Sequence, residues 1–172
     1  SFAVTPSAGV GGEISPNTPQ TITQGSTTSF TVTPDSGYRV SGVDGTCGGS
    51  LSGNSYTTSA ITAACTVEAA FSELDPVLES FSFRAEHNSA LESDLELDAS
   101  GAQFSARLAS IADVKSLVPS FTFQGAEVTV EGVVQASGED AQDFTNVLSY
   151  TVSNESGISK TYEIDLVRFT GL

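Results

Sequence analysis

Apolar and polar residues alternate along short stretches of this chain, and residues that favour turns end each stretch. Phe30 and Val32 alternate with threonines just before the turn sequence Pro34–Gly37. Neighbouring side chains on a β-strand point to opposite faces, so this alternation predicts a strand with one buried face. The pattern recurs as far as Lys160–Phe169. The chain is therefore predicted to be all-β.

Size and charge limit the possible partners. The chain has 172 residues, 38% of them hydrophobic, which suits one domain or two small ones. Its net charge is −15, from 6 basic and 21 acidic residues. Binding to nucleic acids and anionic lipids relies on Lys and Arg, so we expect neither as a partner. No apolar run approaches the roughly 20 residues that span a bilayer, so we expect no membrane insertion.

The acidic residues are concentrated in the second part of the chain. Residues 1–71 hold four acidic residues and one basic residue, whereas residues 72–172 hold seventeen and five. Pro76 lies where the composition changes, and proline cannot donate a hydrogen bond to a sheet. We therefore predict two modules, residues 1–73 and residues 74–172.

The only two cysteines of the chain, Cys47 and Cys65, lie in the first module. Cys47 follows a glycine-rich turn, and Cys65 lies in the last predicted strand of that module. Disulfides persist in oxidising compartments and are rare in the cytosol. The pair predicts a Cys47–Cys65 disulfide that ties a loop to a strand. It also predicts a protein that is secreted or displayed on the cell surface.

The first module contains four stretches that carry a family resemblance: Phe2–Thr5, Gly9–Ile14, Phe30–Val40 and Ile61–Phe71. Through them, residues 2–71 resemble the divergent InlB B-repeat modules of bacterial surface proteins. The paired cysteines resemble the variant found in secreted proteins of Gram-negative bacteria. The resemblance implies a small β-grasp-like fold, and the strand pattern leaves a small β-sandwich open as the alternative.

The second module resembles an immunoglobulin- or cadherin-like module that recurs in bacterial surface proteins. The resemblance covers residues 77–168 and rests on stretches such as Ser80–Phe83, Leu117–Phe121, Gly125–Val130 and Tyr150–Val152. Short strands at this spacing predict an immunoglobulin-like β-sandwich. Neither of the two module families has catalytic residues to carry over.

The end of the chain carries two expectations. Lys160–Phe169 predicts a long strand that pairs with Leu148–Ser153 across the turn Asn154–Gly157 and forms the closing edge of the module. Phe169–Leu172 resembles the lead-in to a CotH-type domain. That resemblance implies a covalently linked downstream domain.

Catalysis is not expected. The chain has a single histidine, His87, and no Gly-x-Ser-x-Gly sequence. One histidine cannot build a histidine-rich zinc site, and no nucleophile elbow is present to pair with it. The simplest interpretation of His87 is an exposed loop residue, and the chain is predicted not to be an enzyme.

Acidic residues alternate between Glu92 and Asp98. Asp94, Glu96 and Asp98 are spaced two apart, which would place their carboxylates on one face of a strand. Carboxylate oxygens are the ligands that Ca²⁺ prefers, so these three residues are candidate metal ligands. The same spacing is equally typical of a solvated strand face. No other cofactor is expected.

Two tyrosines are candidate ligand-binding residues. Tyr38 and Tyr56 could form an aromatic platform for a sugar, because a tyrosine ring buries well while its hydroxyl stays hydrated. The competing interpretation is that both rings pack within the module.

These observations predict a non-catalytic, extracellular tandem module of a secreted or cell-surface bacterial protein. It would act as a spacer or as an adhesion or ligand-presenting region. The alternatives are a carbohydrate-binding accessory module of a secreted enzyme and a calcium-stabilised adhesin domain. The expected partner is a surface polysaccharide or a protein ligand, and we expect the chain to be a monomer.

Overall fold

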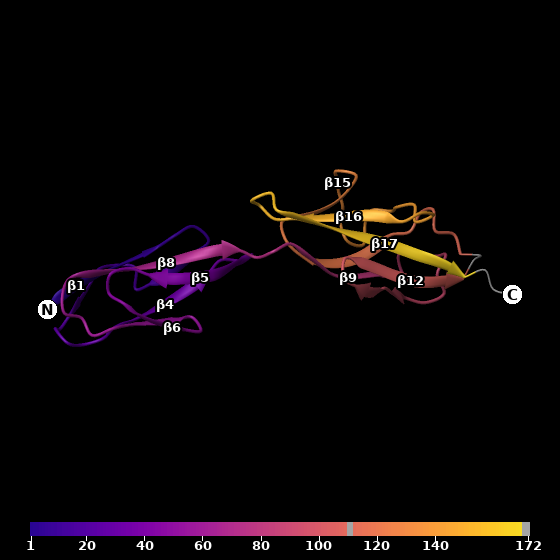
Figure 1. The fold of residues 1–172 in the computed structure, drawn as a ribbon. Helices are drawn as coiled ribbons and strands as arrows, with labels where there is room; N and C mark the ends of the chain where they lie inside the picture. Colours follow the sequence, from indigo (N-terminus) through magenta and orange to yellow (C-terminus); the bar gives the residue numbers. More distant parts are fainter. Residues whose placement is uncertain (110–111, 170–172) are drawn as a thin grey trace. The chain divides into compact units, whose positions relative to one another are not determined.

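The computed structural model describes residues 1–109 and 112–169, and these residues form strands and turns without any helix (Figure 1). The chain divides into two compact units, Ser1–Leu74 (unit 1) and Asp75–Leu172 (unit 2). This division lies one residue beyond the predicted boundary. The all-β fold class with two small modules is confirmed.

Unit 1 is built from two four-stranded sheets. In spatial order, the first sheet contains β3 (Gln20–Ile22), β1 (Phe2–Ala8), β8 (Cys65–Glu73) and β5 (Tyr38–Asp44). The second sheet contains β2 (Gly12–Ser15), β4 (Ser29–Pro34), β7 (Ser55–Thr58) and β6 (Gly49–Ser52). Buried residues of both sheets, among them Val4, Val67, Phe30 and Val32, form one core. Of the two predicted folds, unit 1 is therefore the small β-sandwich.

The first and last strands of unit 1 lie side by side. β1 pairs with β8 in parallel, from Val4 opposite Cys65 to Ala8 opposite Ala69. Parallel neighbours need a crossover connection, because a hairpin can join only antiparallel strands. Here the whole of β2 to β7 forms that connection, so the pairing closes the unit.

The disulfide between Cys47 and Cys65 is present, with an S–S distance of 2.04 Å. It joins the loop after β5 to the first residue of β8. Thr46 and Thr66 reinforce it, since the Thr66 backbone N–H donates to Thr46 Oγ1 at 2.9 Å and the Thr46 N–H donates to Thr66 Oγ1 at 3.3 Å. In the chain-entropy model, closing a loop of 18 residues stabilises a fold by about 3 kcal/mol. The bond supplements a small core.

Unit 2 is an immunoglobulin-like sandwich of a three-stranded and a six-stranded sheet. The three-stranded sheet contains, in order, β10 (Leu95–Glu96), β9 (Val77–Phe83) and β13 (Pro119–Gln124). The six-stranded sheet contains β11 (Asp98–Ser100), β12 (Gln103–Ala109), β17 (Ser159–Phe169), β16 (Leu148–Ser153), β14 (Glu127–Val130) and β15 (Val133–Val134).

Aromatic rings fill the centre of this sandwich. Phe81 on β9 lies with its ring centroid 4.9 Å from that of Tyr150 on β16 and 5.9 Å from that of Phe121 on β13. Phe83 and Phe144 meet edge to face at 4.9 Å. Such pairs add about 0.5–1.5 kcal/mol each beyond the burial of their area. The cluster joins both sheets without the tryptophan and disulfide of antibody domains.

Strand β17 corrects one expectation. Its pairing with β16 is confirmed, from Leu148 opposite Ile164 to Ser153 opposite Ser159. It is not the closing edge, because β12 pairs with its other side in parallel, from Gln103 opposite Glu163 onward. Alternation reports which face of a strand is buried, but not how many neighbours the strand has.

A buried asparagine holds the loop after β9 in place. Asn88 is 3% exposed, and its Oδ1 accepts from the Val118 backbone N–H at 2.7 Å. Its Nδ2 donates to the carbonyl of Arg84 at 2.8 Å and to that of Val118 at 2.9 Å. The side chain thus satisfies backbone groups of two separate segments, as buried polar groups require.

We predict that Asn88→Ala lowers the free energy of unfolding of unit 2 by about 2–4 kcal/mol, because it leaves buried backbone groups without partners. Urea denaturation followed by tyrosine fluorescence measures the change. Ser89→Ala, a change at the exposed neighbour, is the matched control and should have little effect. Equal stability of the Asn88→Ala variant and the parent would contradict this role.

Candidate functional site

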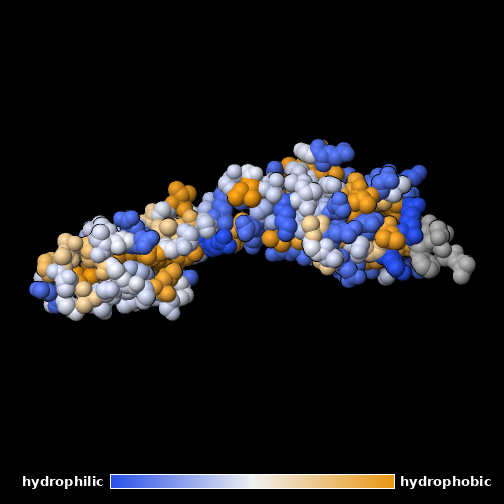
Figure 2. Space-filling view, in the orientation of Figure 1, coloured by the Kyte–Doolittle hydropathy of each residue, from blue (hydrophilic) through white to orange (hydrophobic). Residues whose placement is uncertain are grey.

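The surfaces of the two units differ in polarity. Figure 2 shows mostly pale residues of intermediate hydropathy on the visible face of unit 1, and many strongly hydrophilic residues on that of unit 2. The difference matches the Ser- and Thr-rich first half and the acidic second half of the sequence. The strongest candidates for polar or ionic sites therefore lie in unit 2.

Two of the three candidate metal ligands are paired with an arginine. Arg84 Nη1 lies 3.0 Å from Asp94 Oδ2 and 3.1 Å from Glu96 Oε1. The backbone N–H of Ala85 donates to Asp94 Oδ1 at 2.8 Å. The single positive charge of Arg84 therefore compensates one of the two negative charges.

The same contacts shift two pKa values. Two hydrogen bonds hold the pKa of Asp94 below its ordinary value of 3.8. The bond from the Ala85 N–H has the larger effect, and the bond from Arg84 has the next largest. The pKa of Arg84 is raised, mainly by its hydrogen bond to Asp94 and next by the negative charge of Glu96. Both groups therefore stay charged over a wider pH range than usual.

The third candidate ligand, Asp98, lies on a different sheet. β10 ends at Glu96 in the three-stranded sheet, Leu97 turns into the core, and β11 begins at Asp98 in the six-stranded sheet. Within residues 1–109 and 112–169, no three His, Cys, Asp or Glu side chains are grouped so that they could hold a metal ion. The expected common strand face for Asp94, Glu96 and Asp98 was wrong, because the chain changes sheets at Leu97.

The proposed aromatic platform does not form. Tyr56 lies on β7, is 4% exposed and belongs to the core of unit 1. Tyr38 lies on β5 in the other sheet, where its hydroxyl donates to Glu73 Oε1 at 3.2 Å. Its ring packs so closely on Gly11 that a Cβ at that position would overlap it. Tyr56 is therefore unavailable to a sugar, and the interpretation of packing holds for both rings.

His87 lies in the exposed loop after β9 and lines a polar cleft of about 300 Å³. Its Nε2 is 3.9 Å from Glu86 Oε1. The other polar side chains of the cleft are Asn88, Ser89, Asp113 and Ser116. No sequence pattern pointed to Asp113 and Ser116, because the segment that holds them is distant in sequence from His87.

The geometry of this cleft does not assemble a reaction centre. The Asp113 carboxylate accepts a hydrogen bond from the Lys115 backbone N–H at 3.0 Å, so it stabilises its own turn. Asn88 is fully used by backbone groups. Catalysis would need a nucleophile bonded to a base that a third group orients, and this cleft shows no such chain among its described residues.

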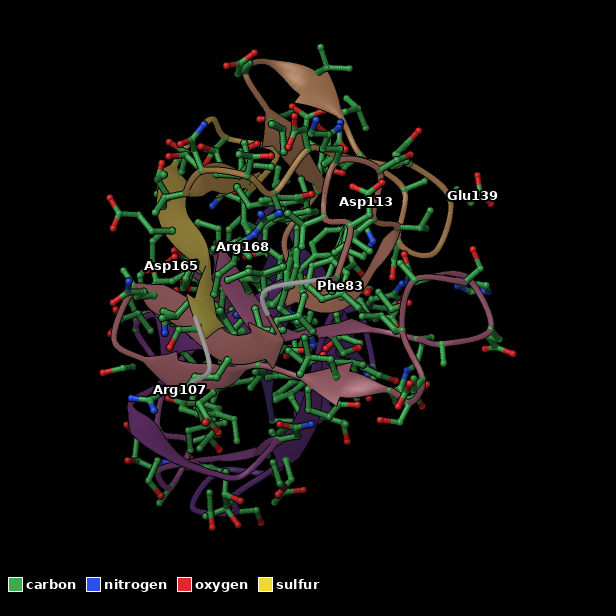
Figure 3. The ribbon with its side chains drawn as sticks, turned by 90° about the vertical axis from the view of Figure 1, so that its right-hand side faces the viewer. Phe83, Arg107, Asp113, Glu139, Asp165 and Arg168 are labelled. Atoms are coloured by element: carbon green, nitrogen blue, oxygen red, sulfur yellow. A yellow bond between two sulfur atoms is a disulfide. The ribbon has the colours of Figure 1, made fainter. Side chains whose placement is uncertain are left out.

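A second, more apolar cleft of about 510 Å³ adjoins the first and shares Asp113 with it. Leu91, Leu95 and Leu108 line it. Figure 3 views this end of unit 2, with Asp113 on one side and Arg107 on the side of β12 and β17.

The part of the chain that the structure describes contains no helix with the length and hydropathy of a membrane span.

The lowered pKa of Asp94 makes a test by pH possible. A lowered folded-state pKa stabilises the fold above the ordinary carboxyl pKa, and this contribution is lost as pH falls through the lowered pKa. We expect Asp94→Asn to be less stable than the parent at pH 7, and the difference to shrink steadily below about pH 4. Urea denaturation at a series of pH values measures it, with Asp98→Asn as the control for loss of one negative charge. A difference that does not change with pH would contradict the assignment.

Comparison with known proteins gives two family matches. Residues 2–75 match the family model described as the divergent InlB B-repeat domain, so the resemblance of the first module is confirmed. Residues 79–166 match the model described as SGBP, N-terminal, which is more specific than the immunoglobulin- or cadherin-like resemblance of the second module. The CotH-type resemblance stays a prediction, and residues 170–172, on which it partly rests, lie outside the described residues.

Other comparisons add little. No curated protein matches the chain. A crystal structure of a candidate glycoside hydrolase from Bacteroides thetaiotaomicron is similar at 19% identity and a TM-score of 0.41, over 57% of this chain. The chain spans 26% of the length of that protein. Over residues 79–166, more than half of its length, the chain belongs to the SGBP N-terminal family, and residues 2–75 before that region match the model of the divergent InlB B-repeat domain.

Proposed function

We propose that the chain is a non-catalytic tandem of β-modules in an extracellular bacterial protein, and that it acts as a spacer for a carbohydrate-binding or carbohydrate-processing domain. The SGBP family name refers to glycan binding, which supports a carbohydrate-related role at the cell surface. The family describes an N-terminal domain, which supports a place before a further domain.

The observation that carries the spacer role is that the fold itself uses the side chains that could have bound a ligand. Tyr56 is in the core, Tyr38 is hydrogen-bonded to Glu73, and Asp94 is bound to Arg84. Sugar sites in proteins are usually clefts with exposed aromatic faces and convergent polar groups. A chain whose aromatic rings pack inward is better suited to hold another domain than to bind a glycan tightly.

One observation favours a second candidate function, which is direct glycan binding. The polar cleft beside His87 offers an imidazole, two hydroxyls and a carboxylate within one hollow. Such groups could hydrogen-bond to sugar hydroxyls. The cleft lacks an aromatic wall among its lining residues, so we place this candidate second.

The spacer function predicts a defined result on cells. A reporter glycan-binding domain is displayed on a bacterial surface with residues 1–172 between the anchor and the reporter. Capture of insoluble polysaccharide should fall when the chain is deleted and should recover with an unrelated two-domain β-spacer. Unchanged capture after deletion would overturn the spacer function.

The same purified chain separates the second candidate from the first. Affinity electrophoresis in gels that contain soluble polysaccharides should show no retardation, and the chain should release no reducing sugar. Retardation that is lost in both His87→Ala and Asp113→Asn, but kept in the control Ser156→Ala outside the cleft, would favour direct binding instead.

A further inference from the structure

The connection between the ends of unit 1 has a mechanical consequence. The chain enters unit 1 through β1 and leaves it through β8, and these two strands are adjacent and parallel. The start of one strand and the end of the other therefore lie at opposite ends of the pair. Within unit 1, Figure 1 shows β8 running away from the end at which the N-terminus lies.

Tension between the two ends of unit 1 acts along these strands. It pulls the start of β1 and the end of β8 in opposite directions, so the two strands are loaded in shear. In shear, all hydrogen bonds of the ladder bear the load together, whereas an antiparallel pair pulled at one end opens one bond at a time. The barrier to forced unfolding is therefore higher in shear, and forced unfolding is governed by that barrier.

The sequence of β1 is compatible with an unbroken ladder. The Gly9 N–H donates to the carbonyl of Ala69 at 2.9 Å, at the end of the β1–β8 pairing. Donors alternate between the two sides of a strand, so the N–H groups of Thr5 and Ser7 face β8 as well. Pro6, which has no N–H, then faces the side of β3, and β3 pairs only with residues 2–4. The single proline in β1 thus removes no bond from the ladder.

Further contacts hold β8 at both ends. At its start, the disulfide joins Cys65 to Cys47. At its end, Tyr38 Oη donates to Glu73 Oε1, and Arg39 Nε donates to Ser72 Oγ, both at 3.2 Å. Because β8 is held at both of its ends, we expect it to stay in place while tension pulls β1 along it.

Unit 2 shares only part of this arrangement, because its exit strand β17 lies in a parallel pair while its entry strand β9 belongs to the other sheet. β17 is paired in parallel with β12 over seven positions, from Gln103 opposite Glu163 to Ala109 opposite Phe169. On its other side β16 pairs with six of its residues. Within unit 2, Figure 1 shows β17 ending at the opposite end from the entry of the chain at Asp75. Tension on the exit strand therefore also acts along a ladder.

We propose that the chain is a load-bearing element, in which the parallel terminal strands β1 and β8 act as a shear clamp that keeps unit 1 folded under tension. The proposal rests on the spacer function, because a spacer that ties a domain to a surface transmits force whenever the bound material is pulled.

Single-molecule force spectroscopy on the full chain tests the clamp by changing only the direction of pull. Non-cysteine handles are placed at the exposed residues Ser1 and Asp75 in one variant, and at Ser36 and Asp75 in another. The first pair shears β1 from β8. The second pair opens the antiparallel β5–β8 pairing from Tyr38 and Glu73 inward. Equal melting temperatures of the two variants establish that the fold is the same.

We expect the rupture force at equal loading rate to be higher in the first geometry by about twofold or more. With the disulfide intact, the extension on rupture in that geometry should be shorter by about 60 Å than after reduction, because 18 residue steps stay closed and the disulfide spans only 4.9 Å between the two Cα atoms. That difference identifies the rupture as unit 1.

Equal forces in the two geometries, or a lower force in the first, would overturn the clamp. The polysaccharide-capture assay tests the spacer function separately, so that function would still stand if capture falls on deletion of the chain. Conversely, unchanged capture after deletion of the chain, with a high shear force, would remove the spacer function and leave the mechanical property.

Discussion

Pairing between strands far apart in sequence closes each unit of this protein. In unit 1, β1 and β8 are parallel neighbours, and every other strand lies between them in the sequence. In unit 2, the last strand β17 lies between β12 and β16. Contacts of such long range are entropically demanding to form, but they make the last strand necessary for the whole sheet. Neither unit can therefore be complete until its final strand is in place.

The two units stabilise that closure in different ways. Unit 1 has a small core, and the Cys47–Cys65 bond, whose two cysteines pack against that core, fixes the start of β8. Unit 2 has no cysteine and instead places Phe81, Phe121 and Tyr150 in contact between its sheets. Burial raises the pKa of the Tyr150 hydroxyl, and the negative charge of Asp140 raises it by a smaller amount. The side chain therefore stays neutral in the core. Small domains commonly need a cross-link where a larger core suffices alone.

The sequence predicted the features that depend on local pattern. Alternation located strands such as β4 and β17, and the cysteine pair predicted the bond that is present. The alternation could not predict the parallel partners of β8 and β17, because it carries no information about which distant strands lie side by side. For the candidate sites, a period of two suggested one face for Asp94 and Asp98, yet the chain changes sheets between them. The sheet change is a property of the sandwich and not of those residues.

Residues 1–74 and 75–172 are self-contained units, each with its own core. Two-dimensional ¹H–¹⁵N NMR spectra of the two separate fragments test it most directly against the spectrum of the full chain. We expect each fragment to give a dispersed spectrum whose peaks overlay those of the full chain except within a few residues of Leu74 and Asp75. Collapse of either spectrum into the narrow range of an unfolded chain, or shifts spread through the cores, would contradict it.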